Sequence, residues 1–354
     1  MHLSSLLLGT TGALAVAAGR TPWAGVNLFG LANDVSIMGS AYTSFVSTDC
    51  KPTYKSYPYL DDVSHYKEWR DKGFNLFRIA IAWQHAQEDL FGALNETNIA
   101  HVEELVEAVH RDGNTAIINI HNYARWYCAI IDQPERSFMN PKLHVTNEHF
   151  TDLWTKLAQR FKKYPNVIFQ LMNEPHDLDM AKWAVTNQQA ILAIRNVTQD
   201  HAVLVSGTQF ARLSDWVDFS APWIGPGLIQ DPANKTMYDF HQYFDGIAGA
   251  YGMCETWRSY VRKFEEVTQI LRKADLHGML TEFGGGPFPQ CRELITYMLS
   301  FLARNSDVWQ GWTAWGSFNP GALYLSTEPN STFYAVTSVL EEFAPKRNTS
   351  LGKR

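Results

Sequence analysis

Short apolar runs alternate with longer amphipathic stretches along this chain. The runs are rich in β-branched or aromatic residues and span 23–29, 75–81, 115–121, 167–173, 202–207, 237–244, 278–284 and 309–316. In several stretches between them, apolar residues recur at the i, i+3, i+4, i+7 spacing that buries one face of a helix. These stretches are 102–109, 150–161, 257–270 and 294–301. We interpret the runs as strands and the periodic stretches as helices that pack on them.

Strands that alternate with helices indicate a parallel sheet, because each helical crossover must return the chain over one face of the sheet. Eight such units in a chain of 354 residues predict the α/β class and a single (β/α)8 TIM barrel. No linker rich in Pro, Gly or Ser divides the chain. We therefore expect one domain over 21–345, followed by a polar tail at 346–354.

The first 20 residues are apolar and rich in small side chains, which predicts a secretory signal peptide at 1–20. A buried first helix is the alternative, but Gly9, Gly12 and the neighbouring threonines disfavour a helix of that length. Asn-x-Ser/Thr sequons also fit a secreted, extracellular glycoprotein, and they lie at Asn95, Asn196, Asn234, Asn330 and Asn348. The four cysteines allow three disulfide pairings in an oxidising compartment, and their spacing matches no zinc motif.

Charge and hydropathy exclude several classes of partner. The net charge is -6 and Lys and Arg form no block, so nothing indicates binding to nucleic acid or to an anionic membrane. Beyond the N-terminus, no segment approaches the ~18 apolar residues of a membrane span. We expect a monomer with a neutral ligand.

The ends of the predicted strands carry polar and aromatic residues. Chemistry in a TIM barrel is located where strands end and the following loops begin. Asn173 and Glu174 end the fourth strand and Glu282 ends the seventh, so two carboxylates face each other across the barrel mouth. Other strand ends contribute Arg78, His121, Asn122, His241, Tyr243 and Trp315. A single histidine or tryptophan is more often a core residue, but their joint placement favours a site.

Two facing carboxylates with flat aromatic rings and hydrogen-bond donors suit the hydrolysis of a glycosidic bond. One carboxyl group protonates the leaving oxygen, and the other supports or attacks the anomeric carbon. Tryptophan rings stack on sugars, while histidine, asparagine and tyrosine bind hydroxyl groups. The residues therefore predict a polysaccharide substrate.

The segments "LMNEPHD", "HNYARW", "LTEFGGG" and "WTAWG", in this order, resemble glycoside hydrolase family five and specifically its secreted fungal endo-β-1,4-glucanases. The resemblance covers the chain from Trp23 to about Pro345. It implies a retaining cellulase that hydrolyses internal bonds of a β-glucan by a double displacement. Glu174 would be the acid/base and Glu282 the nucleophile, without cofactor or metal ion.

The same resemblance implies supporting roles for further residues, which are Arg78, His121, Asn122, Trp126, Asn173, His241, Tyr243 and Trp315. Arg78 and Tyr243 would keep the nucleophile ionised, and His241 would stand near the acid/base. Asn173 and His121 would bind sugar hydroxyl groups above the Trp315 ring. Asn122 and Trp126 are further candidates for contacts with the substrate.

The resemblance also implies a disulfide between Cys254 and Cys291, which leaves Cys50 and Cys128 as neighbours or as free thiols. The chain departs from the family in "YCAIIDQPE" at 127–135, where small residues are usual, at Phe210, where a tryptophan is common, and at Pro287 and Pro289. These loops would build the outer sugar sites. An endo-β-glycanase acting on mixed-linkage glucan, glucomannan or xyloglucan is therefore the main alternative.

Two other classes are less well supported. A metal-dependent barrel hydrolase could use His121, His176, His241 and the two glutamates, but the first strand lacks the paired histidines that such a site needs. A barrel that binds sugar without activity would be expected to lack one carboxylate, and both are present.

Overall fold

The computed structural model describes residues 20–31, 35–41, 47–51, 62–245, 252–316, 325–332 and 334–345. The signal peptide expected at 1–20 lies outside these ranges except for Arg20, as do the tail at 346–354 and the sequon at Asn348. Within the described ranges, no helix combines the length and hydropathy that crossing a membrane would require.

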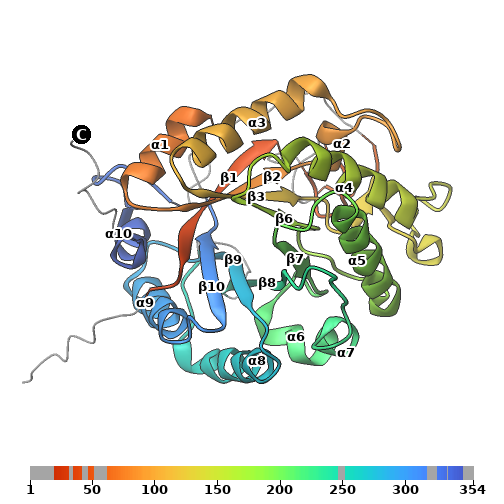
Figure 1. Cartoon of the computed structure of the whole chain (residues 1–354). Helices are drawn as coiled ribbons and strands as arrows, with labels where there is room; N and C mark the ends of the chain where they lie inside the picture. Colours follow the sequence, from red (N-terminus) through yellow and green to blue (C-terminus); the bar gives the residue numbers. More distant parts are fainter. Residues whose placement is uncertain are drawn as a thin grey trace, which may run out of the picture.

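Eight parallel strands form a closed barrel in the spatial order β1, β10, β9, β8, β7, β6, β3, β2 (Figure 1). The strands are β1 Trp23–Leu31, β2 Leu76–Ile81, β3 Thr115–Ile120, β6 Val167–Gln170, β7 Val203–Ser206, β8 Thr236–Tyr243, β9 Gly278–Gly284 and β10 Trp309–Ala314. Each coincides with a predicted run, and the (β/α)8 prediction is confirmed. The largest difference is at β6, which ends at Gln170 instead of at Asn173.

Helices surround the outside of the barrel (Figure 1). They are α1 Val63–Asp71, α2 Trp83–Ala86, α3 Glu96–Arg111, α4 Asn147–Phe161, α5 Met180–Arg195, α6 Leu213–Phe219, α7 Ala221–Ile224, α8 Val261–Lys273, α9 Pro289–Arg304 and α10 Tyr334–Phe343. Two short 3-10 turns, η1 Pro134–Arg136 and η2 Trp257–Ser259, precede α4 and α8. The helix predicted over 257–270 therefore begins later, at Val261. A small hairpin of β4 Arg125–Trp126 and β5 Ala129–Ile130 occupies the loop after β3.

The barrel interior is layered, with an apolar layer below a polar one. The apolar cluster near the strand starts is formed by Leu76, Ile117, Ile168, Leu204, Met237 and Met279. Side chains two positions apart share one face of a strand. Two positions after these residues, the chain carries Arg78, Asn119, Gln170, Ser206, Asp239 and Thr281, all of them buried. The apolar layer closes the bottom of the barrel, and the polar layer supports the site above it.

Two disulfides connect segments that follow strand ends. Cys254 is bonded to Cys291, the pairing that the resemblance implies. Cys50 is bonded to Cys128, so these two cysteines are partners and not free thiols. The second bond connects the segment after β1 to the β4–β5 hairpin. Both bonds hold loops that follow strand ends, which is where a TIM barrel places its site.

Candidate active site

Glu282 lies on β9 and is surrounded by hydrogen-bond donors. Arg78 on β2 donates from Nη1 to Glu282 Oε1 at 2.6 Å, and the Tyr243 hydroxyl on β8 donates to Oε2 at 3.2 Å. His241 Nδ1 lies 3.5 Å from Oε2. Burial raises the pKa of Glu282, while the positive charge of Arg78 and its hydrogen bond oppose that rise. The ion pair with Arg78 favours the carboxylate form at this position.

Arg78 is completely buried and connects four side chains. Besides Glu282, it donates to Gln170 Oε1 at 2.5 Å, to Asn27 Oδ1 at 2.6 Å and to Asn173 Oδ1 at 2.7 Å. The planar guanidinium can serve these acceptors together because its five N–H groups have a fixed geometry. Arg78 thus positions Glu282 and Asn173 in one rigid arrangement.

Asn173 and Glu174 follow β6. The Asn173 backbone N–H donates to Ile120 O at 2.7 Å, which continues the strand pairing past the end of β6. Glu174 has φ of 44°, a left-handed conformation that is uncommon for a side chain of this kind and occurs at functional sites. Asn173 Nδ2 is close to the Tyr123 hydroxyl but makes no hydrogen bond of good geometry within the described residues. The described residues leave this buried donor without a satisfactory partner.

Glu174 is buried beside His241, whose Nδ1 lies 2.7 Å from Glu174 Oε1. Burial raises the pKa of Glu174 to about 8, and the negative charge of Asp239 adds to the rise, while Arg78 and Arg212 oppose it. Among the described residues, no lysine or arginine forms an ion pair with Glu174 of the kind that Arg78 forms with Glu282. The two carboxyl groups are therefore in different environments, and protonation favours Glu174.

Glu174, His241 and Glu282 each place one ligating atom within 4.8 Å of the others. A carboxylate oxygen of Glu174 is thus within 4.8 Å of one of Glu282. Such a cluster could also hold a metal ion. However, hydrogen bonds already engage its atoms, and the other histidines of the metal-site alternative are bound elsewhere. His176 contacts Ile37 O at 2.9 Å and His121 contacts Asn119 at 3.0 Å.

Aromatic rings form one side of the site. Trp315, directly after β10, is partly exposed and stacks on His121 with ring centroids 5.5 Å apart and planes 15° apart. Burial lowers the pKa of His121 well below its ordinary value, which keeps this ring neutral. The backbone N–H of Trp315 donates to Phe283 O at 2.8 Å, so β9 fixes the position of Trp315. The structure therefore brings both residues to the mouth of the barrel.

Two of the predicted contact residues also hold the loops and the core together. Asn122 is completely buried, accepts from the Trp83 N–H at 2.6 Å and donates to Gln84 at 2.7 Å, so it holds loops together. Trp126 is 4% exposed and packs on Trp83 in the core. Tyr123 and Ala124 have φ of 55° and 62°, and these turns direct the rest of the motif into the core.

Sequence reasoning missed the polar layer beneath the carboxylates. Asp239 is completely buried and accepts from Gln170 Nε2 at 2.7 Å, and Ser206 Oγ lies 2.7 Å from the same oxygen and 2.6 Å from Met172 O. Thr281 Oγ1 donates to Asp239 Oδ1 in a short hydrogen bond. The available signal was a charged residue inside an apolar strand, since an aspartate there must be satisfied by polar neighbours.

Comparisons with known proteins agree with this geometry. The family model described as Cellulase (glycosyl hydrolase family 5) matches residues 37–318. Endoglucanase EG-II of Hypocrea jecorina is 31% identical over 320 residues, which are 86% of this chain and 72% of that protein. The crystal structure of Cel5A (EG2) from Hypocrea jecorina superposes with a TM-score of 0.77 at 26% identity, covering 93% of this chain and 99% of that chain.

A structure of XacCel5A in complex with cellopentaose is also similar, with a TM-score of 0.76 and 26% identity. The superposition covers 92% of this chain and 99% of the XacCel5A chain. The fold, the paired carboxylates and the match over most of the chain lead to one conclusion: this chain is a glycoside hydrolase that belongs to glycosyl hydrolase family 5, the cellulase family.

Proposed function

We propose that this chain is a secreted, retaining endo-β-1,4-glucanase that cleaves internal bonds of a β-glucan. The observation that carries the proposal is the short separation of the two carboxyl groups, within 4.8 Å between oxygens of Glu174 and Glu282. Retaining glycosidases hold their carboxyl groups roughly 5–5.5 Å apart, whereas inverting enzymes need roughly 6.5–9.5 Å to admit a water molecule. The names of the relatives supply the polymer, since several are endoglucanases or endo-β-1,4-glucanases.

In the first step, Glu174 protonates the glycosidic oxygen while Glu282 attacks the anomeric carbon. The C–O bond to the leaving sugar breaks as the bond to Glu282 forms, which leaves a covalent glycosyl-enzyme. Glu174 then takes a proton from water, and the resulting attack releases the sugar from Glu282. A pKa of about 8 for Glu174 fits the acid role, and the Arg78 ion pair fits the nucleophile role.

The remaining site residues bind the sugar that undergoes attack. Asn173 offers its free Nδ2 to the 2-hydroxyl, and as a neutral amide it does not lower the pKa of the neighbouring acid as a cation would. His121 binds a further hydroxyl group, and Trp315 provides the flat surface under the ring. Tyr243 donates to Glu282 at 3.2 Å and holds it in line for attack.

The loops that would build the outer sugar sites differ from those of the family, so a second class of polymer must be tested. Phe210 stacks on His176 with centroids 4.4 Å apart, and Tyr127 packs on Trp126 with centroids 5.5 Å apart, both in loops where the sequence departs from the family. Because these loops would build the outer sugar sites, mixed-linkage glucan, glucomannan and xyloglucan are the alternative substrates. A reducing-sugar assay on cellulose, lichenan, mannan, xyloglucan and xylan tests the proposal. The highest rate on a β-1,4-glucan is expected, and no activity on any glucan would contradict it.

Secretion is supported by both disulfides and by the exposure of several sequons. Disulfides persist in oxidising compartments, and Asn196, Asn234 and Asn330 are exposed. Asn95 instead caps α3 through Asn98 N and donates to Glu88 at 2.9 Å, so a glycan on its nitrogen would disrupt that contact. We expect glycans at the three exposed positions. Peptide mass spectrometry of secreted protein tests this, and three unmodified sites would count against the secretory route.

A further inference from the structure

A continuous chain of hydrogen bonds runs from the barrel interior to the proposed acid. Thr281 Oγ1 donates to Asp239 Oδ1, His241 Nε2 lies 3.1 Å from Thr281 Oγ1, and His241 Nδ1 lies 2.7 Å from Glu174 Oε1. Asp239 and Thr281 are completely buried, and His241 is 1% exposed. With so little access to water, these four groups must satisfy one another.

Arg78 fixes the direction of this chain. A guanidinium can only donate, so Gln170 must turn its oxygen toward Arg78 Nε and its Nε2 toward Asp239. The distances are 2.5 Å from Arg78 Nε to Gln170 Oε1 and 2.7 Å from Gln170 Nε2 to Asp239 Oδ2. The Ser206 hydroxyl lies 2.7 Å from the same Asp239 oxygen. That hydroxyl also lies 2.6 Å from Met172 O, so the Gln170 amide is the donor that fixes Asp239 Oδ2 as an acceptor.

The acceptor role of Asp239 decides where the hydrogens of Thr281, His241 and Glu174 lie. The Thr281 hydroxyl has one hydrogen and gives it to Asp239, so toward His241 it can only accept. His241 must then carry its hydrogen on Nε2. Burial lowers the pKa of His241, which keeps the ring neutral and leaves Nδ1 without a hydrogen. Nδ1 can only accept a hydrogen bond from a protonated Glu174.

We propose that Asp239 and Thr281 are positioning residues that hold His241 in its Nε2–H tautomer, so that Nδ1 accepts the acid proton of Glu174. A hydrogen bond that exists only with the protonated carboxyl group favours that form until the proton passes to the leaving oxygen. The inference deepens the proposed function, since it rests on Glu174 being the acid.

The tautomer itself can be measured without any substrate. A two-bond 1H–15N correlation spectrum of the whole protein labelled at histidine reports which ring nitrogen carries the hydrogen, and His241→Asn identifies the signal. We expect Nε2 protonated and Nδ1 unprotonated at neutral pH. A hydrogen on Nδ1 would overturn the inference, whether or not the protein hydrolyses a glucan.

Thr281→Val removes the hydroxyl while preserving the side-chain shape, and Thr281→Ser retains the hydroxyl. Hydrolysis of cellotetraose requires the acid, whereas the dinitrophenolate of an activated aryl cellobioside leaves without protonation. General acid–base catalysis contributes roughly 10²–10⁴-fold, so Thr281→Val should reduce the cellotetraose rate at least about tenfold more than the aryl rate. Thr281→Ser should restore the wild-type ratio. Equal losses on both substrates would show a purely structural role.

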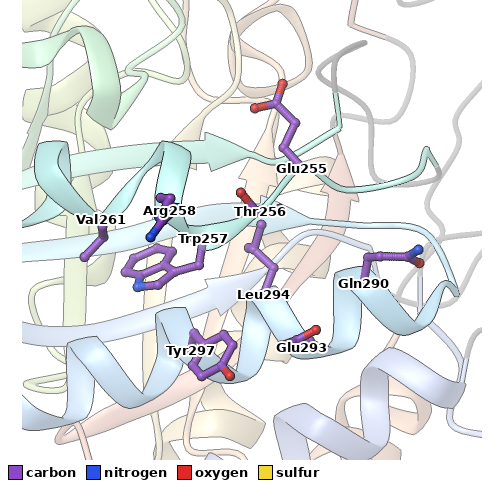
Figure 2. Close-up of a pocket in the computed structure, with 9 residues that line it drawn as sticks. All are labelled: Glu255, Thr256, Trp257, Arg258, Val261, Gln290, Glu293, Leu294 and Tyr297. Carbon is purple, nitrogen blue, oxygen red and sulfur yellow. The ribbon is translucent and has the colours of Figure 1, made fainter.

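A different observation points to a second binding site. A pocket of about 420 Å³ lies between the segment around η2 and the helix α9, and Figure 2 shows the side chains that line it. This volume falls within the roughly 300–1,000 Å³ of small-ligand sites. Its lining includes Glu255 and Trp257 on one side and Gln290, Glu293 and Tyr297 on one face of α9.

The pocket borders the catalytic face. The Glu255 N–H donates to Phe244 O at 2.8 Å, and Phe244 directly follows Tyr243 at the end of β8. The Cys254–Cys291 disulfide joins the two walls, with Gly285 so close that a side chain there would meet Cys254 Sγ at 2.6 Å. A cross-linked pocket is preformed, so a ligand would lose little free energy in ordering it.

The chemistry of the lining matches a sugar. Tyr297 is 50% exposed and Trp257 is partly exposed, and such rings can cover the apolar C–H face of a pyranose. Gln290 and Glu293 lie beside them and can bind hydroxyl groups. We infer that this pocket binds a β-glucan segment outside the catalytic cleft. The inference rests on the proposed function, because only a polymer can extend from one site to the other.

Binding to amorphous cellulose by protein carrying Glu282→Gln measures the cleft and this pocket together without hydrolysis, and a change at Tyr297 reports the pocket. Adding Tyr297→Ala should reduce the bound fraction several-fold, whereas the control Trp223→Ala, at a residue 47% exposed on α7, should not. In the active enzyme, Tyr297→Ala should reduce the rate on the polymer more than the rate on cellotetraose. Unchanged binding, or equal losses on both substrates, would overturn this inference. Inactivity of the wild type on cellotetraose would instead contradict the proposed function.

Discussion

A carboxylate oxygen of Glu174 lies within 4.8 Å of a carboxylate oxygen of Glu282. Glu174 follows β6 and Glu282 lies on β9, and only the closed barrel brings them together. Arg78 contacts Glu282 directly, while Glu174 contacts the neutral His241. The pair therefore combines a short distance with unequal protonation, as a double displacement requires.

The first prediction concerns the pH dependence of kcat/KM. Glu174 must be protonated to act as the acid, and its pKa is about 8, so activity on cellotetraose should fall as pH rises through about 8. Glu282 must be ionised, and burial raises its pKa, so the acidic limb should lie above the ordinary pKa of a glutamate.

An activated aryl cellobioside is the control, because its leaving group needs no protonation. The alkaline limb should disappear or weaken with this substrate. The groups that act on Glu174 are Arg78, Arg212, Asp239, His241 and Glu282. An alkaline limb that is identical for both substrates would exclude Glu174 as its origin.

The second prediction concerns Arg78. Arg78→Lys keeps the charge, but a single ammonium cannot reach all the acceptors that the guanidinium serves. Loss of one preorganised donor reduces kcat by roughly 10²–10³-fold, and we expect a loss of at least this size. Arg195→Lys is the matched control, because Arg195 is also buried and paired, with Asp231 at 2.6 Å, but lies away from the site. Similar losses in both variants would indicate a stability effect alone.

The third prediction concerns the nucleophile. Glu282→Gly should be almost inactive, but azide fits the space that the carboxylate leaves and can attack the anomeric carbon from the same side. An activated aryl cellobioside with azide should therefore give the α-glycosyl azide. Glu174→Gly is the comparison, and its azide product should have the β configuration. A β-azide from Glu282→Gly would show that Glu282 is the acid/base and Glu174 the nucleophile.

The fourth prediction concerns stability. The Cys254–Cys291 bond closes a separation of 37 residues, and the loop-entropy relation gives about 4 kcal/mol for a loop of this size. The Cys50–Cys128 bond closes 78 residues and should contribute slightly more. Denaturant unfolding of each double-alanine variant measures the loss in free energy of unfolding. A negligible loss in both variants would contradict this account.

The barrel and the carboxylate pair could be read from the sequence because each strand is a short apolar run and both glutamates fall at strand ends. Asp239, Gln170 and Thr281 could not, since they lie inside runs that read as apolar strands. Their common spacing, two positions after the apolar layer, becomes informative only once the inward face of each strand is known. Strand register supplies that face.

Two residues beside the site show a different limit. Asn122 and Trp126 belong to a motif beside the site, but positive φ angles at Tyr123 and Ala124 turn the chain between them. Asn122 holds neighbouring loops and Trp126 enters the core. Likewise, four cysteines allow three pairings, so the partner of Cys50 is known only when the positions of the loops are known. Local backbone turns, and not residue type, decide these positions.

Proton NMR of the first sugar released by the wild-type enzyme tests the central claim most directly. If Glu282 attacks the anomeric carbon and water then displaces it, the configuration is inverted twice, and the initial product must be the β-anomer. The spectrum must be recorded before mutarotation equilibrates the anomers. An initial β-anomer supports the double displacement by Glu174 and Glu282. An initial α-anomer would contradict it and would require a water molecule between the sugar and the second carboxylate.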